Sequence, residues 1–528
     1  MNAADQIKSG QVSLGIEFGS TRIKACLIGE NPNQVLGVGS FEWENQLVDG
    51  LWSYPQRAIW DGLAAAFADL QSNLQSAHGA KLASFKSLGV SAMMHGYLAF
   101  DSQGELLVPF RTWRNTNTAE AAAQLSSLFN FNIPLRWSIA HLHQLALEKA
   151  EHISRVDHVT TLAGYVHWML TGKKVLGVGD ASGMFPIDSL TGQFDASMLE
   201  KYSKLPEASF LPRPLLELLP EVLPAGSNAG TLTESGALLL DPTGGLKSGA
   251  VLCPPEGDAG TGMVATNAVA PTTANISAGT SIFAMVVMEK PLSKYHHELD
   301  IVTTPVGDQV AMVHCNNGAS EMAQWVGMFK AFSEASGQNL SSDEIYAILF
   351  EKALHGEPDA GGLVAYNYLA GEPITGVEKG VPTFVRTPDS KFTLANAMKS
   401  QIFGIFGTLS LGMRVLEEEG VNITRMAAHG GIFRTAGIAQ QVLSAAIAAP
   451  VAVSSTASEG GAWGMALLAQ FAISSIDTLP EYLNTQVFAD DDSSVYQASQ
   501  VELDGYAMYL KRYEAALPIV KTAAQVLR

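Results

Sequence analysis

The sequence predicts an α/β protein made of two similar halves. Strand-like runs alternate with helical segments along 528 residues, a length that suits two or more domains. Hydrophobic residues make up 47% of the chain and charged residues 16%, which is enough apolar material for two cores. A strand, a glycine turn and a second strand occur near residue 17 and again near residue 279. This repeat is only weak evidence for two similar halves, because hairpins are common in α/β proteins.

The expected elements follow from hydrophobic periodicity and turn residues. In the first half we expect strands at 12–18, 23–28 and 88–91 and helices at 57–77, 117–129 and 140–152. In the second half we expect strands at 250–253, 273–277 and 282–287 and helices at 394–418, 437–448 and 501–528. The Pro- and Gly-containing segment 211–249 is expected to be a boundary region.

Composition excludes several classes of partner. The net charge of −19 argues against nucleic acid and anionic membrane, although a local pocket of N–H groups can still bind a nucleotide. The three cysteines are sparse and widely spaced, which indicates a reduced compartment. We find no apolar run of about 18 residues and no signal-peptide pattern at the start. We therefore expect a cytoplasmic protein without nucleic-acid or membrane partners.

Two glycine-bearing turns are candidate phosphate sites. They contain Gly19, Ser20 and Thr21 in the first half and Gly279, Thr280 and Ser281 in the second. Consecutive N–H groups and hydroxyls in such turns can hold phosphate oxygens. Glu17 adds a carboxylate where hydrated Mg²⁺ could bind. Taken alone, the first turn is slightly better explained as an ordinary hairpin turn and the second equally well, but their occurrence in both halves favours phosphate binding.

Asp258 is the candidate catalytic base. It lies among glycines directly after the expected strand 250–253, and active sites gather at the carboxyl ends of strands in α/β folds. A carboxylate there can accept the proton of an attacking hydroxyl and orient that nucleophile for phosphoryl transfer. The alternative is a turn in which Asp258 bonds only its own backbone.

A further group of residues suits a sugar, which needs hydrogen-bonding groups on one side and an apolar plate on the other. The candidates are Met94, His95, Gly96, Trp113, Arg114 and Asn115. A capped strand with a buried tryptophan explains the same pattern. Gly430 and Gly431, and the later pair Gly460 and Gly461, could let a flat base lie against the backbone. Taken alone, both pairs are better explained by close packing at helix starts.

Taken together and in this order, these segments resemble the FGGY carbohydrate kinases, and among them the xylulokinase-like ketopentose kinases. The resemblance covers nearly the whole chain. It includes the segment from Gly179 to Gly183, the Tyr-Leu-x-Gly-Glu sequence that ends at Glu372, and the Glu-Gly-Gly sequence that begins at Glu459. No single motif is decisive, but six or more in the right order are hard to obtain otherwise.

The resemblance implies a two-lobed fold of the actin/Hsp70/hexokinase type, which is ribonuclease H-like, with a cleft between the lobes. We expect an N-terminal lobe at 12–255, a C-terminal lobe at 256–500 and a helical tail at 501–528. Asp258 would be the base, and Glu17 would hold Mg²⁺. The two turns would bind the phosphates of ATP, and Gly430, Gly431 and Glu459 would lie near adenosine. The partners would be a sugar and ATP, and the resemblance also allows a homodimer.

The sequence departs from the family pattern at four places. Glu17 stands where the family usually has Asp, Met93 where xylulokinases usually have Gln, and Asn115 where many members have Asp. The segment 135–138 also matches the usual lysine-containing signature poorly. The last three departures bear on the identity of the sugar more than on the reaction.

The predicted function is ATP-dependent phosphorylation of a terminal hydroxyl of a ketopentose, with D-xylulose ahead of L-ribulose. Three alternatives stay open at this point. The acceptor could be another polyol or a sugar acid. The protein could be an actin- or Hsp70-like ATPase that phosphorylates no sugar. It could also be a weakly active sugar sensor, given Glu17.

Overall fold

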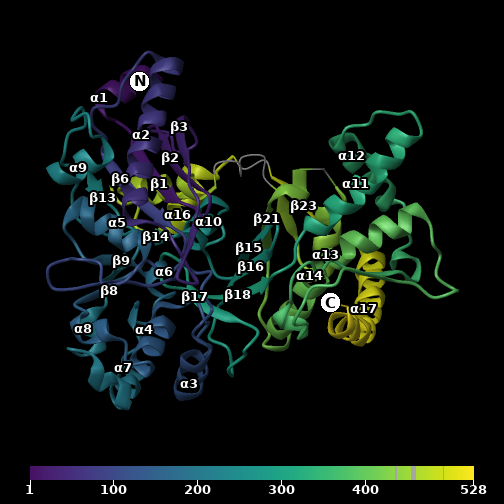
Figure 1. The fold of residues 1–528 in the computed structure, drawn as a ribbon. Helices are drawn as coiled ribbons and strands as arrows, with labels where there is room; N and C mark the ends of the chain where they lie inside the picture. Colours follow the sequence, from purple (N-terminus) through teal and green to yellow (C-terminus); the bar gives the residue numbers. More distant parts are fainter. Residues whose placement is uncertain (435–436, 454–459, 491–492, 528) are drawn as a thin grey trace. The chain divides into compact units, whose positions relative to one another are not determined.

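The computed structural model describes residues 1–434, 437–453, 460–490 and 493–527. The chain forms two compact units, each with its own sheet and helices (Figure 1). Unit 1 contains residues 1–270, 301–310 and 456–490, and unit 2 contains residues 271–300, 311–455 and 491–528. None of the helices described is long and apolar enough to cross a membrane.

The main sheet of unit 1 has the strand order β13-β6-β1-β2-β3, and β14 also pairs with β6. Its strands are β1 (Ser13–Phe18), β2 (Arg22–Ile28), β3 (Val35–Glu42), β6 (Ser87–Ala92), β13 (Val251–Leu252) and β14 (Glu256–Gly257). Strand β6 runs parallel to β1 and β14, with Ala92 in register with Phe18 and with Gly257. The carboxyl ends of all three strands therefore lie at one edge of the sheet.

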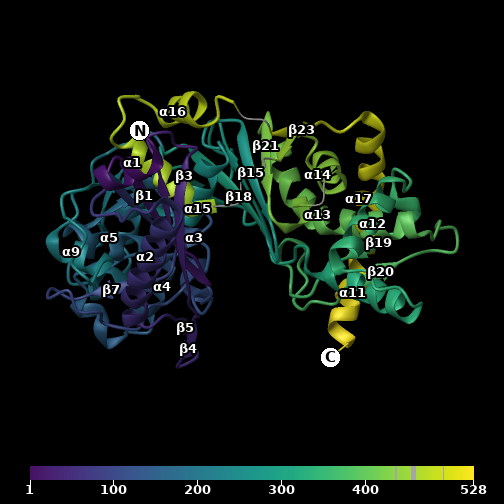
Figure 2. The same ribbon diagram turned by 90° about the horizontal axis from the view of Figure 1, so that it is seen from above.

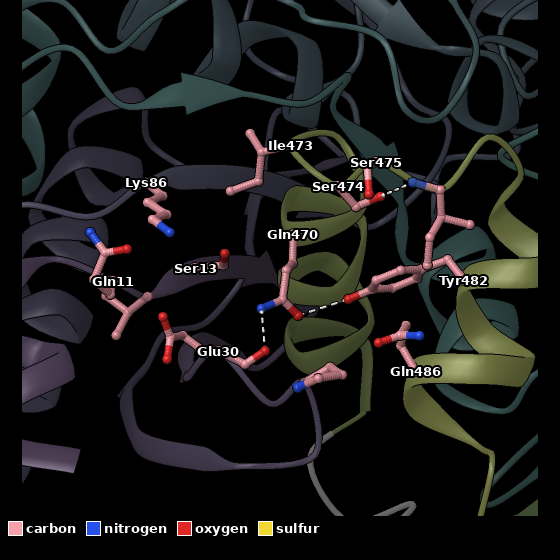
Figure 3. Close-up of a pocket in the computed structure, with 13 residues that line it drawn as sticks. Gln11, Ser13, Glu30, Lys86, Gln470, Ile473, Ser474, Ser475, Tyr482 and Gln486 are labelled. Carbon is pink, nitrogen blue, oxygen red and sulfur yellow. Dashed lines mark hydrogen bonds between the residues drawn. The ribbon is translucent and has the colours of Figure 1, made fainter. Parts of the chain in front are cut away.

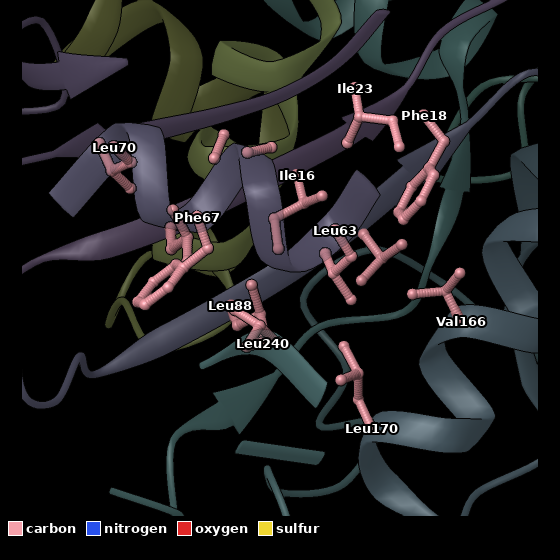
Figure 4. Close-up of a cluster of buried hydrophobic side chains, with 14 of the residues drawn as sticks. Ile16, Phe18, Ile23, Leu63, Phe67, Leu70, Leu88, Val166, Leu170 and Leu240 are labelled. Atoms are coloured by element: carbon pink, nitrogen blue, oxygen red, sulfur yellow. The ribbon is translucent and has the colours of Figure 1, made fainter. Parts of the chain in front are cut away.

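Helices cover both faces of this sheet. On one face, α2 (Gln56–His78) directs Leu63, Phe67 and Leu70 toward Ile16 and Leu88 in a buried cluster (Figure 4). Successive residues of a strand point to opposite faces, so the odd-numbered residues of β1 face the other side.

On that other side lies α15 (Gly460–Phe471). A Cβ at Gly15 would be 2.2 Å from the carbonyl oxygen of Ala462, so the helix packs directly on the strand backbone. Glu17 shares this face with Gly15, which brings its side chain against the start of α15.

The other helices of unit 1 surround this core. They are α1 (Ala3–Ser9), α3 (Ala119–Phe129), α4 (Ser138–Leu147), α5 (Leu162–Thr171), α6 (Val178–Ala181), α7 (Ala196–Ser203), α8 (Leu215–Leu218), α9 (Glu234–Leu240), α10 (Asp258–Ala265) and α16 (Leu479–Tyr482). Short strand pairs join them: β4 (Gln46–Val48) with β5 (Leu51–Ser53), β7 (Leu98–Phe100) with β8 (His158–Thr160), β9 (Val175–Gly177) with β12 (Glu221–Leu223), and β10 (Ile187–Asp188) with β11 (Gln193–Phe194).

Unit 2 is built on the sheet order β18-β16-β15-β21-β22-β23, with β17 next to β18. Its strands are β15 (Thr273–Ala278), β16 (Ile282–Val287), β17 (Asp300–Thr303), β18 (Gln309–Cys315), β21 (Arg425–His429), β22 (Val451–Val453) and β23 (Ser494–Tyr496). The chain passes from one unit to the other within β17 and again within β18. A separate hairpin joins β19 (Val364–Tyr366) to β20 (Thr383–Val385).

The helices of unit 2 are α11 (Ser320–Ala335), α12 (Ser342–Leu354), α13 (Leu394–Glu418), α14 (Ile438–Ile447) and α17 (Gln500–Val526). Within this unit, α13 and α14 lie beside β21 (Figure 2). The last helix belongs to the same unit: Arg414 of α13 pairs with Glu514 at 2.7 Å. The predicted C-terminal helix is thus present as α17, and it packs into unit 2.

The predicted strands and long helices are present, within a few residues at their ends. Both predicted hairpins exist, as β1 with β2 in unit 1 and as β15 with β16 in unit 2. Helix α4 ends earlier than expected, and a 3₁₀ helix, Glu151–Arg155, follows it.

Two expectations differ from the structure. The segment 211–249 is no boundary, because it carries α8, β12 and α9 inside unit 1. The expected lobe 256–500 also differs from the compact units, since residues 256–270 and 460–490 lie in unit 1. The physical cause is that β14 pairs with β6 and α15 packs on β1.

Candidate active site and nucleotide pocket

Asp258 lies at the edge of the unit 1 sheet where β1, β6 and β14 end. It is the first residue of α10, with Gly257 as the N-cap, so the expected glycine loop is in fact a helix start. One carboxylate oxygen, Oδ1, accepts the main-chain N–H of Ala259 at 2.9 Å and that of Met94 at 3.2 Å. The local bond to Ala259 matches the turn alternative. The bond to Met94 ties Asp258 to the segment after β6, where sugar contacts are predicted.

Glu17 is a second acid of this site. A Cβ at Gly461 would lie 2.4 Å from its Oε1, so only glycine leaves room for the carboxylate under α15. Burial, and then the charge of Asp258, raise the pKa of Glu17 to about 7. Burial raises the pKa of Asp258 to about 6, although the N–H groups of Met94 and Ala259 oppose this shift.

This pair of acids suits a divalent cation, which would relieve the repulsion between two carboxylates that share a poorly hydrated site. No group of three or more metal-binding side chains occurs in the described parts of the chain. Mg²⁺ usually keeps several waters and binds one or two carboxylates together with substrate phosphates, so Glu17 fits such an ion.

Two further acids lie behind Asp258 and were not predicted as site residues. Asp180 and Glu256 are fully buried, with exposed fractions of 0% and 1%. Glu256 accepts the main-chain N–H of Asp180 at 2.9 Å, and Thr161 donates its hydroxyl to Asp180 at 2.6 Å. Burial, then the neighbouring Asp180, raise the pKa of Glu256 to about 8. Burial, opposed by the Thr161 bond and aided by Asp258, raises the pKa of Asp180 to about 7.

The sequence did carry a signal for these acids. Glu256 comes two residues before Asp258, and Asp180 lies in the segment from Gly179 to Gly183 that matched the family. Acids are almost never fully buried unless they are paired, so the burial of both indicates a local role around Asp258.

The first glycine turn is held through its carbonyl groups. Trp43 Nε1 donates to the oxygen of Gly19 at 2.7 Å, and the hydroxyl of Tyr54 donates to the oxygen of Ser20 at 2.6 Å. The main-chain N–H of Trp43 donates to the oxygen of Thr21 at 3.1 Å. In a trans peptide the N–H points away from the C=O. The N–H groups of Ser20 and Thr21 therefore point away from the aromatic pair, as a phosphate site requires.

The second turn in unit 2 is arranged in the same way. Ala319 donates its main-chain N–H to the oxygen of Gly279 at 2.8 Å, and Gly318 donates to the oxygen of Thr280 at 2.7 Å. The N–H groups of Thr280 and Ser281 consequently point away from the 318–319 segment. In both turns the carbonyl groups are fixed from one side, which leaves the N–H groups on the other side.

A cavity of about 610 Å³ in unit 2 adjoins the second turn. Gly279, Thr280 and Gly431 line it, so it joins one phosphate candidate to one adenosine candidate. Its other side is formed by α11 and α12, including Asp343 and Tyr346. The volume lies in the range of small-molecule sites.

The adjacent glycines at 430 and 431 differ in their surroundings. Gly430 has a φ of 120°, and a Cβ there would lie 2.2 Å from the oxygen of Ala278. A Cβ at Gly431 would meet no atom within 4 Å. Gly430 is therefore needed for the backbone to pass β15, whereas Gly431 faces open space in the cavity.

The predicted sugar residues lie in unit 1 with different surroundings. The indole of Trp113 is 37% exposed and donates to Ser20 Oγ at 3.3 Å, so it lies beside the first turn. His95 is buried, pairs with the oxygen of Gly183 at 3.2 Å and stacks on Trp137.

For Gly96 and Asn115, contacts with the main chain explain why these residue types stand there. A Cβ at Gly96 would be 2.4 Å from the oxygen of Arg111, so this glycine allows a close backbone approach. Asn115 is buried, and its amide accepts from the N–H of Trp52 and donates to the oxygen of Trp52, each at 2.8 Å. That pairing uses both ends of the amide in fixing the β5 strand.

Of the later glycine segments, Gly461 packs against Glu17 and Thr261 in unit 1, whereas Gly430 and Gly431 lie in unit 2. Close packing at a helix start therefore explains Gly461. Glu459, predicted near adenosine, lies outside the described residues.

A second pocket, of about 300 Å³, lies in unit 1 beside the first residues of β1 and the last residues of α15 (Figure 3). Its lining includes Ser13, Lys86 and Gln470, and Tyr482 donates to Gln470 at 2.7 Å. It contains none of the predicted site residues.

Comparison with known proteins decides the family. Residues 12–246 match the model of the FGGY family of carbohydrate kinases, N-terminal domain, and residues 274–473 match the C-terminal domain. The chain belongs to the FGGY family of carbohydrate kinases. This FGGY kinase is accordingly an ATP-dependent sugar kinase, and the alternative of a chaperone-like ATPase is excluded.

Relatives of this FGGY kinase are distant in sequence. It is 20% identical over 510 residues to a xylulose kinase of Staphylococcus epidermidis, covering 96% of both chains. It is also 20% identical over 431 residues to a xylulose kinase of Haemophilus influenzae, covering 79% of this chain and 82% of that protein.

Solved structures share the fold along nearly the whole chain. The xylulose kinase of Rhodospirillum rubrum aligns with a TM-score of 0.78 at 17% identity, covering 97% of this chain and 100% of the other. The gluconate kinase of Lactobacillus acidophilus aligns with a TM-score of 0.75 at 18% identity, covering 97% and 98%. The glycerol kinase of Plasmodium falciparum, solved with ADP, gives 0.73 at 13% identity, covering 96% and 98%. The predicted fold class, the two-domain actin/hexokinase-like fold, is confirmed.

Proposed function

We propose that this FGGY kinase transfers the γ-phosphate of ATP to a terminal hydroxyl of a ketopentose, with D-xylulose as the first candidate and L-ribulose as the second. The observation that carries the proposal is the setting of Asp258, whose carboxylate is held by two N–H groups at the joint edge of β1, β6 and β14. The names of the xylulose kinase relatives support the choice of sugar.

Asp258 acts as the base in this proposal. Its Oδ2 takes the proton of the sugar hydroxyl, while Oδ1 stays bonded to Met94 and Ala259. The hydroxyl oxygen forms a bond to the γ-phosphorus as the bond to the β-bridging oxygen breaks, and ADP leaves. With a pKa raised to about 6, Asp258 is mostly ionised at neutral pH and is still a better proton acceptor than an ordinary aspartate.

Glu17 would hold a hydrated Mg²⁺, and that ion would supply positive charge to the phosphates of ATP. The outward N–H groups of Ser20 and Thr21 in unit 1, and those of Thr280 and Ser281 in unit 2, are candidate donors to phosphate oxygens. The cavity lined by Gly279, Thr280 and Gly431 accommodates the adenosine side of ATP. A homodimer and a cytoplasmic location stay predictions.

Trp113 is the apolar plate for the sugar, because its indole is partly exposed beside the first turn. Met94, His95 and Gly96 form the part of the proposed sugar site that lies next to Asp258. Asn115 contributes indirectly, by fixing the backbone at Trp52.

A polyol or a sugar acid is the second candidate acceptor, since a glycerol kinase and a gluconate kinase share the fold. A panel of ketopentoses, glycerol, ribitol and gluconate, assayed for ADP release, tests both. We expect the highest kcat/KM for one ketopentose. A higher value for a non-pentose would contradict the proposal.

A further inference from the structure

The Tyr-Leu-x-Gly-Glu sequence that matched the family has no role in the chemistry described so far. Its glutamate, Glu372, is fully buried in unit 2, with an exposed fraction of 0%. A buried carboxylate is unfavourable unless it is hydrogen-bonded, so its partners reveal what it stabilises.

Two of the hydrogen bonds to this carboxylate come from one residue, Asn317. Glu372 Oε2 accepts the side-chain amide of Asn317 at 3.0 Å and its main-chain N–H at 3.3 Å. The other end of the amide, Oδ1, accepts the N–H of Ala370 at 2.8 Å. Asn317 is itself 4% exposed, so its side chain has little freedom to move.

A second amide fixes the next peptide. Asn367, which is also 4% exposed, donates from Nδ2 to the oxygen of Gly318 at 2.7 Å and to that of Asn317 at 3.2 Å. Both peptides after Asn317 are thus held in one orientation by the segment 367–372.

The orientation of these peptides determines how the second glycine turn is held. Gly318 donates its N–H to the oxygen of Thr280, and Ala319 donates to that of Gly279. The contact leaves no space, since a Cβ at Gly318 would lie 2.2 Å from the oxygen of Gly279. The hydrogen bonds therefore run without a break from Glu372 through Asn317 and Gly318 to the turn.

We propose that Glu372 is a positioning residue for the second glycine turn: through Asn317 it fixes the peptides that aim the N–H groups of that turn at ATP. The proposal rests on the proposed assignment of this turn to ATP phosphate. Glu372 itself touches neither substrate, so its loss acts on nucleotide affinity and leaves the sugar side unchanged.

The test compares Glu372→Gln, Glu372→Ala and Ser410→Ala in the full-length protein, with KM for ATP and for the sugar, kcat and melting temperature. In the Gln variant the amide oxygen replaces Oε2 and still accepts from Asn317. The amide nitrogen replaces Oε1, which is buried and has no hydrogen-bond partner in the described structure. We expect near wild-type KM for ATP with Gln, and a rise of about tenfold with Ala, the factor expected for losing one hydrogen bond to a charged group.

Ser410→Ala is the matched control, because it removes a buried hydrogen bond of unit 2, at 2.9 Å to Tyr506, that involves neither the turn nor Glu372 and Asn317. We expect it to lower the melting temperature and leave KM for ATP unchanged. Equal KM values for ATP in the wild type and Glu372→Ala would overturn the proposal, as would an equal rise in the Ser410→Ala variant.

Gly279→Ala separates this proposal from the assignment of the turn. A Cβ there meets no atom within 4 Å, so the protein tolerates it while the methyl group occupies the turn. If Gly279→Ala leaves KM for ATP unchanged, the assignment of the turn to ATP is wrong. If it raises KM for ATP while Glu372→Ala does not, only the positioning role is wrong.

Discussion

Asp258 Oδ1 accepts the main-chain N–H of Met94 at 3.2 Å, which joins the start of α10 to the segment that follows β6. The register that aligns Gly257 with Ala92 makes this bond possible. One carboxylate oxygen is thereby fixed, and the other is left for a substrate proton. The sugar-side segment and the catalytic candidate are thus held as one piece of unit 1.

Replacement of Asp258 by Asn should remove phosphoryl transfer and keep the fold. The amide oxygen can still accept the N–H groups of Met94 and Ala259, but it is a very poor proton acceptor. We expect ADP release to fall at least about 10²-fold, the lower range for loss of a general base. ATP binding, measured by calorimetry, should stay within about twofold. Turnover near the wild-type rate would contradict the role of Asp258.

The pH dependence of kcat/KM should show an ascending limb. Asp258 must be ionised to accept a proton, and burial raises its pKa to about 6. Activity should therefore rise as pH increases from 5 to 7, with a midpoint near that value. The measurement is the ADP release rate at saturating ATP and low sugar. A midpoint close to 4, the ordinary value for aspartate, would show that Asp258 is not the controlling group.

The glycines at 430 and 431 should respond differently to alanine. Gly430→Ala meets the oxygen of Ala278 at 2.2 Å in a backbone conformation that disfavours side chains, so we expect a lower melting temperature. Gly431→Ala faces open space, so we expect an unchanged melting temperature with KM for ATP raised about tenfold by the methyl group in the cavity. Unchanged KM for ATP in the second variant would argue against nucleotide binding there.

Replacement of Asp180 by Asn should stabilise the protein at high pH relative to low pH. Burial raises the pKa of Asp180 to about 7, so the unfolded chain loses this proton at lower pH than the folded one. Wild-type stability therefore falls as pH rises between about 4 and 7, whereas the amide cannot titrate. We expect the free energy of unfolding of the variant to gain on the order of 3 kcal/mol over the wild type across this window. Denaturant unfolding at pH 5 and pH 8 measures the change, and a difference independent of pH would contradict it.

Gly15→Ala tests the packing of α15 on β1. The added Cβ would lie 2.2 Å from the oxygen of Ala462 and 2.3 Å from the nitrogen of Ala466, and both are backbone atoms that cannot move aside alone. We expect a loss of about 1–3 kcal/mol, the usual range for overpacking. Gly327→Ala, within α11 and in open space, is the control and should stabilise by up to about 1 kcal/mol. Equal stability of the two variants would contradict the contact.

Much of this fold could be predicted from local pattern. The hairpin around Ser20 and the helix α13 follow from strand periodicity, turn glycines and helical spacing. Asp258 was predicted because an acid among glycines directly after a strand lies where active sites gather in α/β folds, and its catalytic role stays a prediction. Its place as the first residue of α10 was not found, since that depends on the pairing of β14 with β6.

Other features depend on tertiary contacts that no local pattern records. The amide of Asn115 suits a sugar hydroxyl and a strand backbone equally well, and the structure pairs it with Trp52. The acids Asp180 and Glu256 are far apart in sequence, so their burial together could not be predicted from either segment. Gly461 was grouped with Gly430 and Gly431 as a candidate contact for a flat base, although it packs against Glu17 in unit 1.

The position of α15 has a consequence for biosynthesis. Strand β1 is synthesised first, yet α15, which covers the face of β1 that contains Gly15, is translated more than 440 residues later. During translation this face stays open to water and to chaperones until most of unit 2 has emerged from the ribosome. A gene truncated after residue 270, where the first segment of unit 1 ends, should consequently yield a largely insoluble product, and co-expression of residues 456–490 as a separate peptide should raise the soluble fraction.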